Sequence, residues 1–374
     1  MRLTQLTSLI VGALCAALTL GCEQKKSHQP PAPTAAVSKR IAAPRPLERA
    51  PEFEPAVVPV PDVDATCARV AATPIPNGDL PTEAERASLT GCDSETLYYG
   101  IGAPADFTRA RHCAYLENLR PEPKPPQQKH SVIGGPAILM MIYANGLGVG
   151  RNVDLSLRFA CEFGGSGFEV EARIAQLLLR AAPYALSEPR MDVCDNITSG
   201  YMAGFCAGHD ERIARVARQA RMRVATAGFP PKELEALQRA AASYVDTKSN
   251  FEVDLSGSAR AAFAIEAKQR LSDEVLSMLE QLHDPAFVPP SQSLTSLEAE
   301  LISTQAHALR CREHPLLNSV SAAGVQKTQA AWVRYRDAFN ELAHKVRPEV
   351  PPEKWSSWLI QQRLIQLQEL AAYC

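Results

Sequence analysis

The clearest hydrophobic pattern in this chain lies near its middle and has the period of an α-helix. Between residues 138 and 143, apolar side chains follow the i, i+1, i+4, i+5 spacing of a buried helix face. Gly146 and Gly148 come soon afterwards, and glycine readily adopts the positive φ that ends a helix. Asp154 is a suitable N-cap for a second helix that carries the apolar side chains of residues 155–160. The pattern therefore predicts a helical hairpin.

A weaker copy of this hairpin precedes it. Cys113 follows Asp106 by seven positions, and Cys161 follows Asp154 by seven positions, so the two cysteines lie 48 positions apart. A fixed period of this size indicates helical hairpins that stack on one another.

The motifs around the second hairpin resemble a known repeat family. Residues 142–149, which read Ile-Tyr-Ala-Asn-Gly-Leu-Gly-Val, and residues 154–160 resemble the Sel-type repeat, a relative of the tetratricopeptide repeat. The earlier copy is shorter by two residues between its glycine and its aspartate. The resemblance implies stacked hairpins that bind proteins or act as scaffolds, with a simple helical spacer as the alternative.

The C-terminal half contains a second internal repeat. Residues 238–244 match residues 329–335 at an offset of 91, and residues 269–271 match residues 362–364 at an offset of 93. We expect each copy to form a helical hairpin that is entered by a preceding long helix.

Two motifs within these copies resemble the lysozyme-inhibitor LprI family. The first comprises residues 194–199 with Cys206 further on, and the second is residues 329–338, which contain a Gln-x-x-Trp helix and a Tyr-Arg-Asp sequence. The resemblance implies helical units that inhibit lysozyme. Trp332 and Tyr335 lie three positions apart on one helix face, so we predict that both are core residues.

The N-terminus has the features of a bacterial lipoprotein signal peptide. Arg2 precedes an apolar run over residues 9–20, whose 12 residues are too few to span a bilayer as a stable helix. Residues 18–22, Leu-Thr-Leu-Gly-Cys, resemble the lipobox of lipoproteins, so Cys22 is the predicted lipidation site. An ordinary signal peptide or an uncleaved anchor is the alternative. Because Glu23 rather than an aspartate follows Cys22, the resemblance implies a cell-envelope protein, lipid-anchored in the outer membrane and facing the periplasm.

A proline-rich segment follows the lipidation site. Nine prolines occur between residues 30 and 61, and proline holds a chain near the extended polyproline II conformation. The predicted fold class is all-α, with stacked Sel-like helical hairpins followed by tandem helical-bundle units, and disulfide-stapled. The predicted organisation is a signal peptide over 1–21, a disordered tether over 22–62, a Sel-like repeat region over 63–190, and LprI-like units over 191–290 and 291–374.

The cysteines predict a disulfide framework. Of ten cysteines, Cys15 leaves with the signal peptide and Cys22 carries lipid, and the remaining eight are an even number in an exported chain. Zinc is disfavoured because the chain has no CxxC pair. Eight cysteines allow 105 pairings. We expect the pairs Cys67–Cys92, Cys113–Cys161, Cys194–Cys206 and Cys311–Cys374. The third pair requires a bend near Gly200, because one continuous helix would hold its ends about 18 Å apart.

Charge and motifs argue against several function classes. The formal net charge of −2 favours neither nucleic acid nor an acidic surface as a partner. The sequence has no HExxH, GxSxG or P-loop motif, so we expect no enzyme, no cofactor and no metal. Residues 209–211, His-Asp-Glu, are predicted to form a polar helix face. Asp192 and Asp195 are predicted to act at a helix start rather than to bind a cation.

These observations predict an envelope lipoprotein that binds a protein partner through a helical-repeat surface, without catalysis. It would contact the membrane through the lipid on Cys22, and it would not bind nucleic acid. One alternative is a lysozyme (muramidase) inhibitor of the LprI type. A second alternative is a purely structural envelope scaffold.

Overall fold

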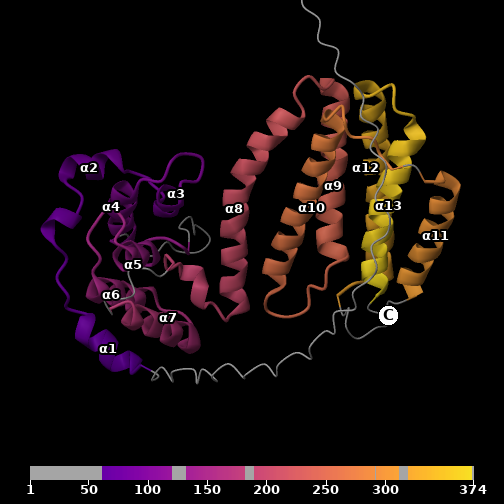
Figure 1. The fold of residues 1–374 in the computed structure, drawn as a ribbon. Helices are drawn as coiled ribbons and strands as arrows, with labels where there is room; N and C mark the ends of the chain where they lie inside the picture. Colours follow the sequence, from indigo (N-terminus) through magenta and orange to yellow (C-terminus); the bar gives the residue numbers. More distant parts are fainter. Residues whose placement is uncertain (1–60, 120–131, 182–188, 291, 311–318, 373–374) are drawn as a thin grey trace, which may run out of the picture. The chain divides into compact units, whose positions relative to one another are not determined.

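The structure is a computed structural model that describes residues 61–119, 132–181, 189–290, 292–310 and 319–372. These residues belong to one compact unit, and every regular element among them is helical, which confirms the all-α prediction (Figure 1). The predicted signal peptide, Cys22 and all of the tether before residue 61 lie outside the described residues. The elements are α1 (Val63–Val70), η1 (Asn77–Asp79), α2 (Glu83–Ser88), α3 (Ser94–Tyr99), α4 (Phe107–Asn118), α5 (Pro136–Asn145), α6 (Val153–Phe163), α7 (Gly167–Leu179), η3 (Val193–Asn196), α8 (Gly200–Ala225), α9 (Pro231–Phe251), α10 (Arg260–His283), α11 (Leu294–Arg310), α12 (Ala322–Val346) and α13 (Pro352–Ala371).

The N-terminal core is built around α5. Residues 137–144 of this helix are all buried, and a helix that is apolar on every side must be enclosed on every side. Helices α3, α4 and α6 pack against it. Inside this core the hydroxyls of Tyr115 and Tyr143 lie 2.7 Å apart, and Tyr143 donates to the Asp79 carboxylate at 2.8 Å. The hydroxyls of these two buried tyrosines are therefore paired, as a stable interior requires.

The two N-terminal hairpins repeat at 46 positions rather than at the predicted 48. Gly100 and Gly146 end α3 and α5 with φ of 70° and 66°, and Asp106 and Asn152 are the N-caps of the helices that follow. The backbone hydrogen bonds that close the two turns repeat at the same offset. The predicted N-cap at Asp154 is therefore wrong, because this residue lies in the first turn of α6. The turns of the two hairpins are equally long, so the prediction that the earlier one is two residues shorter is also wrong.

This register explains why two predicted disulfides are wrong. The structure joins Cys67 to Cys161 and Cys92 to Cys113, instead of Cys67 to Cys92 and Cys113 to Cys161. At an offset of 46, Cys113 corresponds to Phe159, so Cys113 and Cys161 are two positions out of register and about 200° apart around equivalent helices. Helix α1 instead packs against α6, and α2 and α3 pack against α4, which brings the observed pairs together.

The predicted disulfide between Cys194 and Cys206 is confirmed. The Cα atoms of the two residues lie 6.0 Å apart, because the chain leaves η3, turns at Ser199 and only then enters α8. The Ser199 side chain accepts a backbone N–H of the first turn of α8, as serine commonly does at an N-cap. Cys311 and Cys374 lie outside the described residues.

Helix α8 approaches α10 closely through three glycines at four-residue spacing. A Cβ atom at Gly200 would overlap the backbone of Ser258, and one at Gly204 would lie 3.1 Å from the Ala261 Cβ. A Cβ atom at Gly208 would be 3.9 Å from the nearest atom of α10. The contact is therefore tightest where α8 begins and relaxes along the helix.

One hydrophobic core spans both predicted C-terminal units. It contains buried residues from α9, α10, α11, α12 and α13, on both sides of the predicted boundary at residues 290 and 291. Helix α9 packs mainly on α12, α8 packs on α10, and α11 packs on α13. The two copies therefore share one interior instead of forming two separate bundles.

The two copies of the C-terminal repeat meet through equivalent residues. Tyr244 and Tyr335 correspond at the offset of 91, and their rings stack with centroids 5.4 Å apart and planes 10° apart. Further along, the Nζ atom of Lys327 lies 4.4 Å from the centroid of the Phe251 ring, so α9 and α12 run antiparallel. Trp332 and Tyr335 are each 2% exposed, which confirms that they are core residues.

Candidate partner-binding groove

A groove with a volume of about 580 Å³ is lined by α8, α9 and α10. It falls within the roughly 300–1,000 Å³ range of ligand pockets in proteins. Helices α8 and α9 both contact α10 but make few contacts with each other, so the groove lies between them. Its apolar lining consists of Met222, Leu237, Ala241, Ala242, Val245, Val275 and Leu279.

The apolar stripe of the groove follows from helical spacing. On α9, Leu237, Ala241 and Val245 recur every four residues and therefore share one face. On α10, Val275 and Leu279 have the same spacing. The small alanine side chain between the larger residues of α9 leaves the groove open. This stripe has the pattern by which helical surfaces receive an amphipathic helix.

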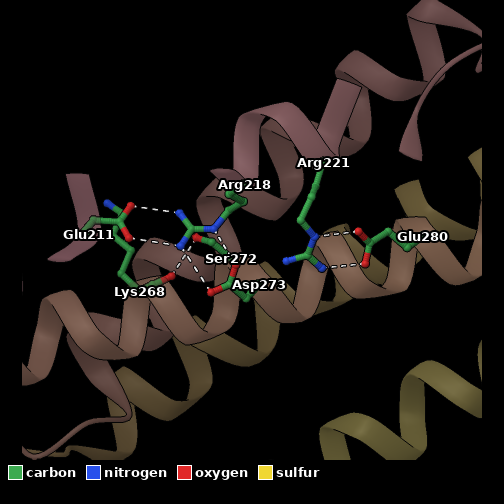
Figure 2. Close-up of polar contacts among 7 residues, drawn as sticks. All are labelled: Glu211, Arg218, Arg221, Lys268, Ser272, Asp273 and Glu280. Atoms are coloured by element: carbon green, nitrogen blue, oxygen red, sulfur yellow. Dashed lines mark hydrogen bonds and ion pairs between the residues drawn. The ribbon is translucent and has the colours of Figure 1, made fainter. Parts of the chain in front are cut away.

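An ion-pair cluster centred on Arg218 fastens α8 to α10 beside the groove. The Arg218 side chain donates to both carboxylate oxygens of Glu211 at 3.0 and 3.2 Å, and to both oxygens of Asp273 at 2.8 and 3.4 Å (Figure 2). Burial by itself lowers the pKa of the Arg218 guanidinium, but the hydrogen bonds to Asp273 and Glu211 outweigh that effect and raise the pKa. Glu211 lies on α8 itself and holds the guanidinium in place, while the bidentate contact with Asp273 joins α8 to α10.

Two further ion pairs lie near the groove and are more exposed. Arg221 donates to both oxygens of Glu280 at 2.9 and 2.7 Å, one helical turn from Arg218 (Figure 2). The Lys268 Nζ atom lies 3.1 Å from the Asp246 carboxylate and joins α10 to α9. All four side chains are between one third and two thirds exposed, so each pair contributes little to stability and remains available to a partner.

Arg215 is the unneutralised charge of the groove. Of the arginines on α8 around it, Arg212, Arg218 and Arg221 form ion pairs, whereas Arg215 has none with any residue that the structure describes. A guanidinium at the edge of an apolar groove favours a carboxylate on whatever the groove receives.

The structure corrects the interpretation of His209. We predicted a polar helix face, but His209 is only 4% exposed, and its Nδ1 atom lies 2.7 Å from Oε1 of the fully buried Glu95. Its ring also packs on Tyr99, with centroids 4.0 Å apart. Asp210, the next residue, is exposed. His209 therefore joins α8 to α3 as a buried structural group.

Asp192 and Asp195 act at a helix start. They form a reciprocal capping box around η3, in which the Asp192 side chain accepts the N–H of Cys194 and Asp195 accepts the N–H of Asp192. Across the described ranges, no group of three or more His, Cys, Asp and Glu side chains is arranged to hold a metal ion. Among the same residues, every helix is too short or too polar to traverse a lipid bilayer.

The groove itself was not predicted from the sequence. Arg218 and Arg221 lie on one helix, but their partners Asp273 and Glu280 lie more than 50 residues away along the chain. Asp273 and Glu280 lie seven residues apart, so they share one face of α10. This spacing is the one signal in the sequence that could have indicated the contact between α8 and α10.

Comparison with known proteins gives no match. No family model, no curated protein and no solved structure is similar to this chain.

Proposed function

We propose that this protein is a lipid-anchored lipoprotein of the bacterial envelope that binds a protein partner without catalysis. The partner is proposed to place an amphipathic helix in the groove between α8 and α9. The observation that carries the proposal is the groove itself, an apolar stripe bordered by charged side chains. The lipobox-like sequence that ends at Cys22 supports the anchor.

The proposed occupant has a stated chemistry. Its apolar face would contact the exposed Ala242 and the half-buried Met222, above a floor formed by the buried side chains of Leu237, Ala241 and Val245. A Glu or Asp at the edge of that face would pair with Arg215, whose charge is unneutralised within the described structure. Apolar anchors supply most of the affinity of such interfaces, while the charge fixes orientation.

A photo-crosslinking experiment in cells tests this proposal. A photoreactive residue at Gln238, which lines the groove, should give a discrete adduct with one envelope protein. Ala242→Trp fills the groove from an exposed position and should abolish the adduct. Ala299→Trp is the matched control, because Ala299 is exposed on α11, away from the groove, and this variant should retain the adduct.

The identity of the adduct distinguishes the alternatives. Recovery of a muramidase, together with slower lysozyme-driven loss of turbidity in cell suspensions, would support inhibition of the LprI type. An adduct that survives Ala242→Trp would show that the groove is not the binding surface. An adduct formed from a photoreactive residue at position 298 on α11, but not from one at position 238, would show that the partner binds another face of the protein.

A further inference from the structure

A second cavity lies inside the C-terminal core, separate from the groove. Its volume is about 200 Å³, and it is lined by α10 and α13 with α9 and α12. Four aromatic side chains line it, which are Tyr244, Trp332, Tyr335 and Trp358. The two tyrosines are the stacked pair at the contact between the repeats. The cavity therefore combines aromatic and polar side chains in its lining.

The rim of this cavity is polar but carries little charge. Helix α10 contributes Glu274, Ser277 and Gln281, and α13 contributes Gln362 and Gln366. Each glutamine amide has two donor hydrogens and an acceptor oxygen, so the rim can both donate and accept hydrogen bonds. A hydroxyl, which also donates and accepts, is the natural complement of such a rim.

One hydroxyl of the lining has a weak partner. Tyr335 donates to the thioether sulfur of Met278 at 3.1 Å, and a thioether is a poor acceptor. Tyr335 is 2% exposed, so this hydroxyl has no bulk water as an alternative. An oxygen atom of a ligand would be a better acceptor for it.

The charges near the cavity argue against an anionic ligand. Arg363 lines the cavity, but its guanidinium donates to Glu252 at 2.8 and 2.6 Å and to Gln329 at 3.0 Å. Both Arg363 and Glu252 have fully buried side chains, so this pair is closed to exchange with a ligand. An anion would find no free guanidinium fork here, and it would meet the Glu274 side chain at the rim.

The same charges argue against a cationic ligand. A cation would approach Arg363, and it would rely on Glu274 as its counter-charge. Burial raises the pKa of the Glu274 carboxyl, so its environment disfavours the charged form. Gln366 already donates to that carboxyl at 3.2 Å.

We propose that this cavity binds a neutral pyranose sugar. A pyranose has apolar faces of C–H groups, which pack on aromatic rings, and hydroxyls around its edge, which match the amides of the rim. Its ring would lie against Trp358, which at 6% is the most exposed of the four aromatic side chains, and its hydroxyls would bond to Gln281 and Gln362. This inference concerns a small molecule in the core, and it is independent of the partner proposed for the groove.

The three tryptophans of the chain provide the measurement. Trp332 and Trp358 line the cavity, and Trp355 lies 5.9 Å from Trp358 between ring centroids, so intrinsic fluorescence reports on this region. The full chain would be titrated with glucose, with N-acetylglucosamine and with choline chloride. A saturable change in emission with a sugar, and none with choline, is the expected result.

Variants at the rim make the test specific. Gln362→Ala should weaken sugar binding about tenfold through loss of the rim amide, and its exposed position should leave the fold intact. Gln368→Ala, on the same helix but outside the cavity, should bind as the unchanged protein does. A response to choline that Glu274→Gln abolishes would overturn the proposal in favour of a cation site. Absence of a response to any of the three probes, with circular dichroism unchanged, would also overturn it.

Discussion

The carboxylate of Glu169 accepts the backbone N–H of Ser199 at 2.8 Å, although the two residues lie 30 positions apart. It also accepts the N–H of Thr198 at 2.9 Å and that of Ser166 at 3.3 Å, the latter in the capping box of α7. One buried side chain therefore caps the start of α7 and holds the segment that leads into α8. Burial acts to raise the pKa of Glu169, but the N–H groups of Ser199, Thr198 and Ser166 outweigh it and lower the pKa to about 2.

This lowered pKa predicts acid sensitivity. A carboxyl with a pKa of 4.5 in the unfolded chain and about 2 in the fold stabilises the protein fully above pH 4.5. The stabilisation, roughly 3 kcal/mol, is then lost as the pH falls from 4.5 to 2. Glu169→Gln should lower the free energy of unfolding at pH 7 and should flatten its dependence on pH below 4.5. Urea unfolding at several pH values measures both effects.

Glu171→Gln is the matched control for this prediction. Glu171 lies on the same helix but takes no part in the cap, so its replacement should leave the acid limb of the stability curve unchanged. Equal losses of the free energy of unfolding in the two variants would show that the bonds from Thr198 and Ser199 to Glu169 contribute nothing specific.

The close contact of α8 and α10 predicts opposite outcomes for two glycines. Gly200→Ala places a methyl group against the Ser258 backbone, and should cost about 1–3 kcal/mol or more because backbone must move. Gly208→Ala meets its nearest atom, Cδ1 of Ile265, at 3.9 Å, and should be neutral or stabilising by up to about 1 kcal/mol. Thermal unfolding of the two variants checks this, and a tolerated Gly200→Ala would contradict the packing described.

The disulfides differ in how much of the chain they close. Cys67–Cys161 spans 94 positions, and Cys194–Cys206 spans 12. In the loop-entropy account, removal of the longer link costs about 2 kcal/mol more. Unfolding of the paired serine variants Cys67→Ser/Cys161→Ser and Cys194→Ser/Cys206→Ser measures the difference. Peptide mapping without reduction should recover the Cys67–Cys161 link, and a Cys67–Cys92 link would refute the observed connectivity.

The buried ion pair of Arg363 and Glu252 predicts strong coupling. Arg363→Met leaves the Glu252 carboxylate buried with only Lys248 beside it, at 3.1 Å, and should cost about 3–5 kcal/mol. The double variant Glu252→Gln/Arg363→Met should recover part of this loss, because no uncompensated carboxylate remains. A double-mutant cycle by urea unfolding gives the coupling energy. If the stability losses of the two single variants simply add in the double variant, Arg363 and Glu252 are not energetically coupled.

The lipid anchor has a direct chemical test. Cys22→Ser should abolish incorporation of radiolabelled palmitate in cells, because serine cannot form the thioether to the lipid. Cys15→Ser, within the apolar run, should still be labelled. Label that persists in Cys22→Ser would refute the predicted lipidation site.

Local sequence patterns predicted the structural features that depend on residues close to one another in the chain. The core positions of Trp332 and Tyr335 follow from their spacing. The bend that allows Cys194 to reach Cys206 follows from helix geometry alone. In each case, the deciding residues lie within about a dozen positions of one another.

What the sequence could not predict depends on distant contacts. Residues 209–211 are predicted to form a polar helix face, yet the partner of His209 is Glu95, which lies 114 positions away. The hairpin period was taken from the cysteines, whereas glycine turns and caps set the actual register at 46. The groove depends on the angle of α8, which Arg218 helps to fix through Asp273 on α10. The contacts of His209 and Arg218 have no local signature in the sequence.

The stacking of Tyr244 on Tyr335 has a consequence for how the two repeats of the C-terminal half would behave if they were separated. Equivalent residues that meet across antiparallel helices are the arrangement of an isologous homodimer, here joined within one polypeptide. Each repeat alone would expose a surface that only another copy could cover. Cleavage of the chain near residue 290 should therefore yield two fragments that re-associate, or that each dimerise, rather than two independent soluble domains.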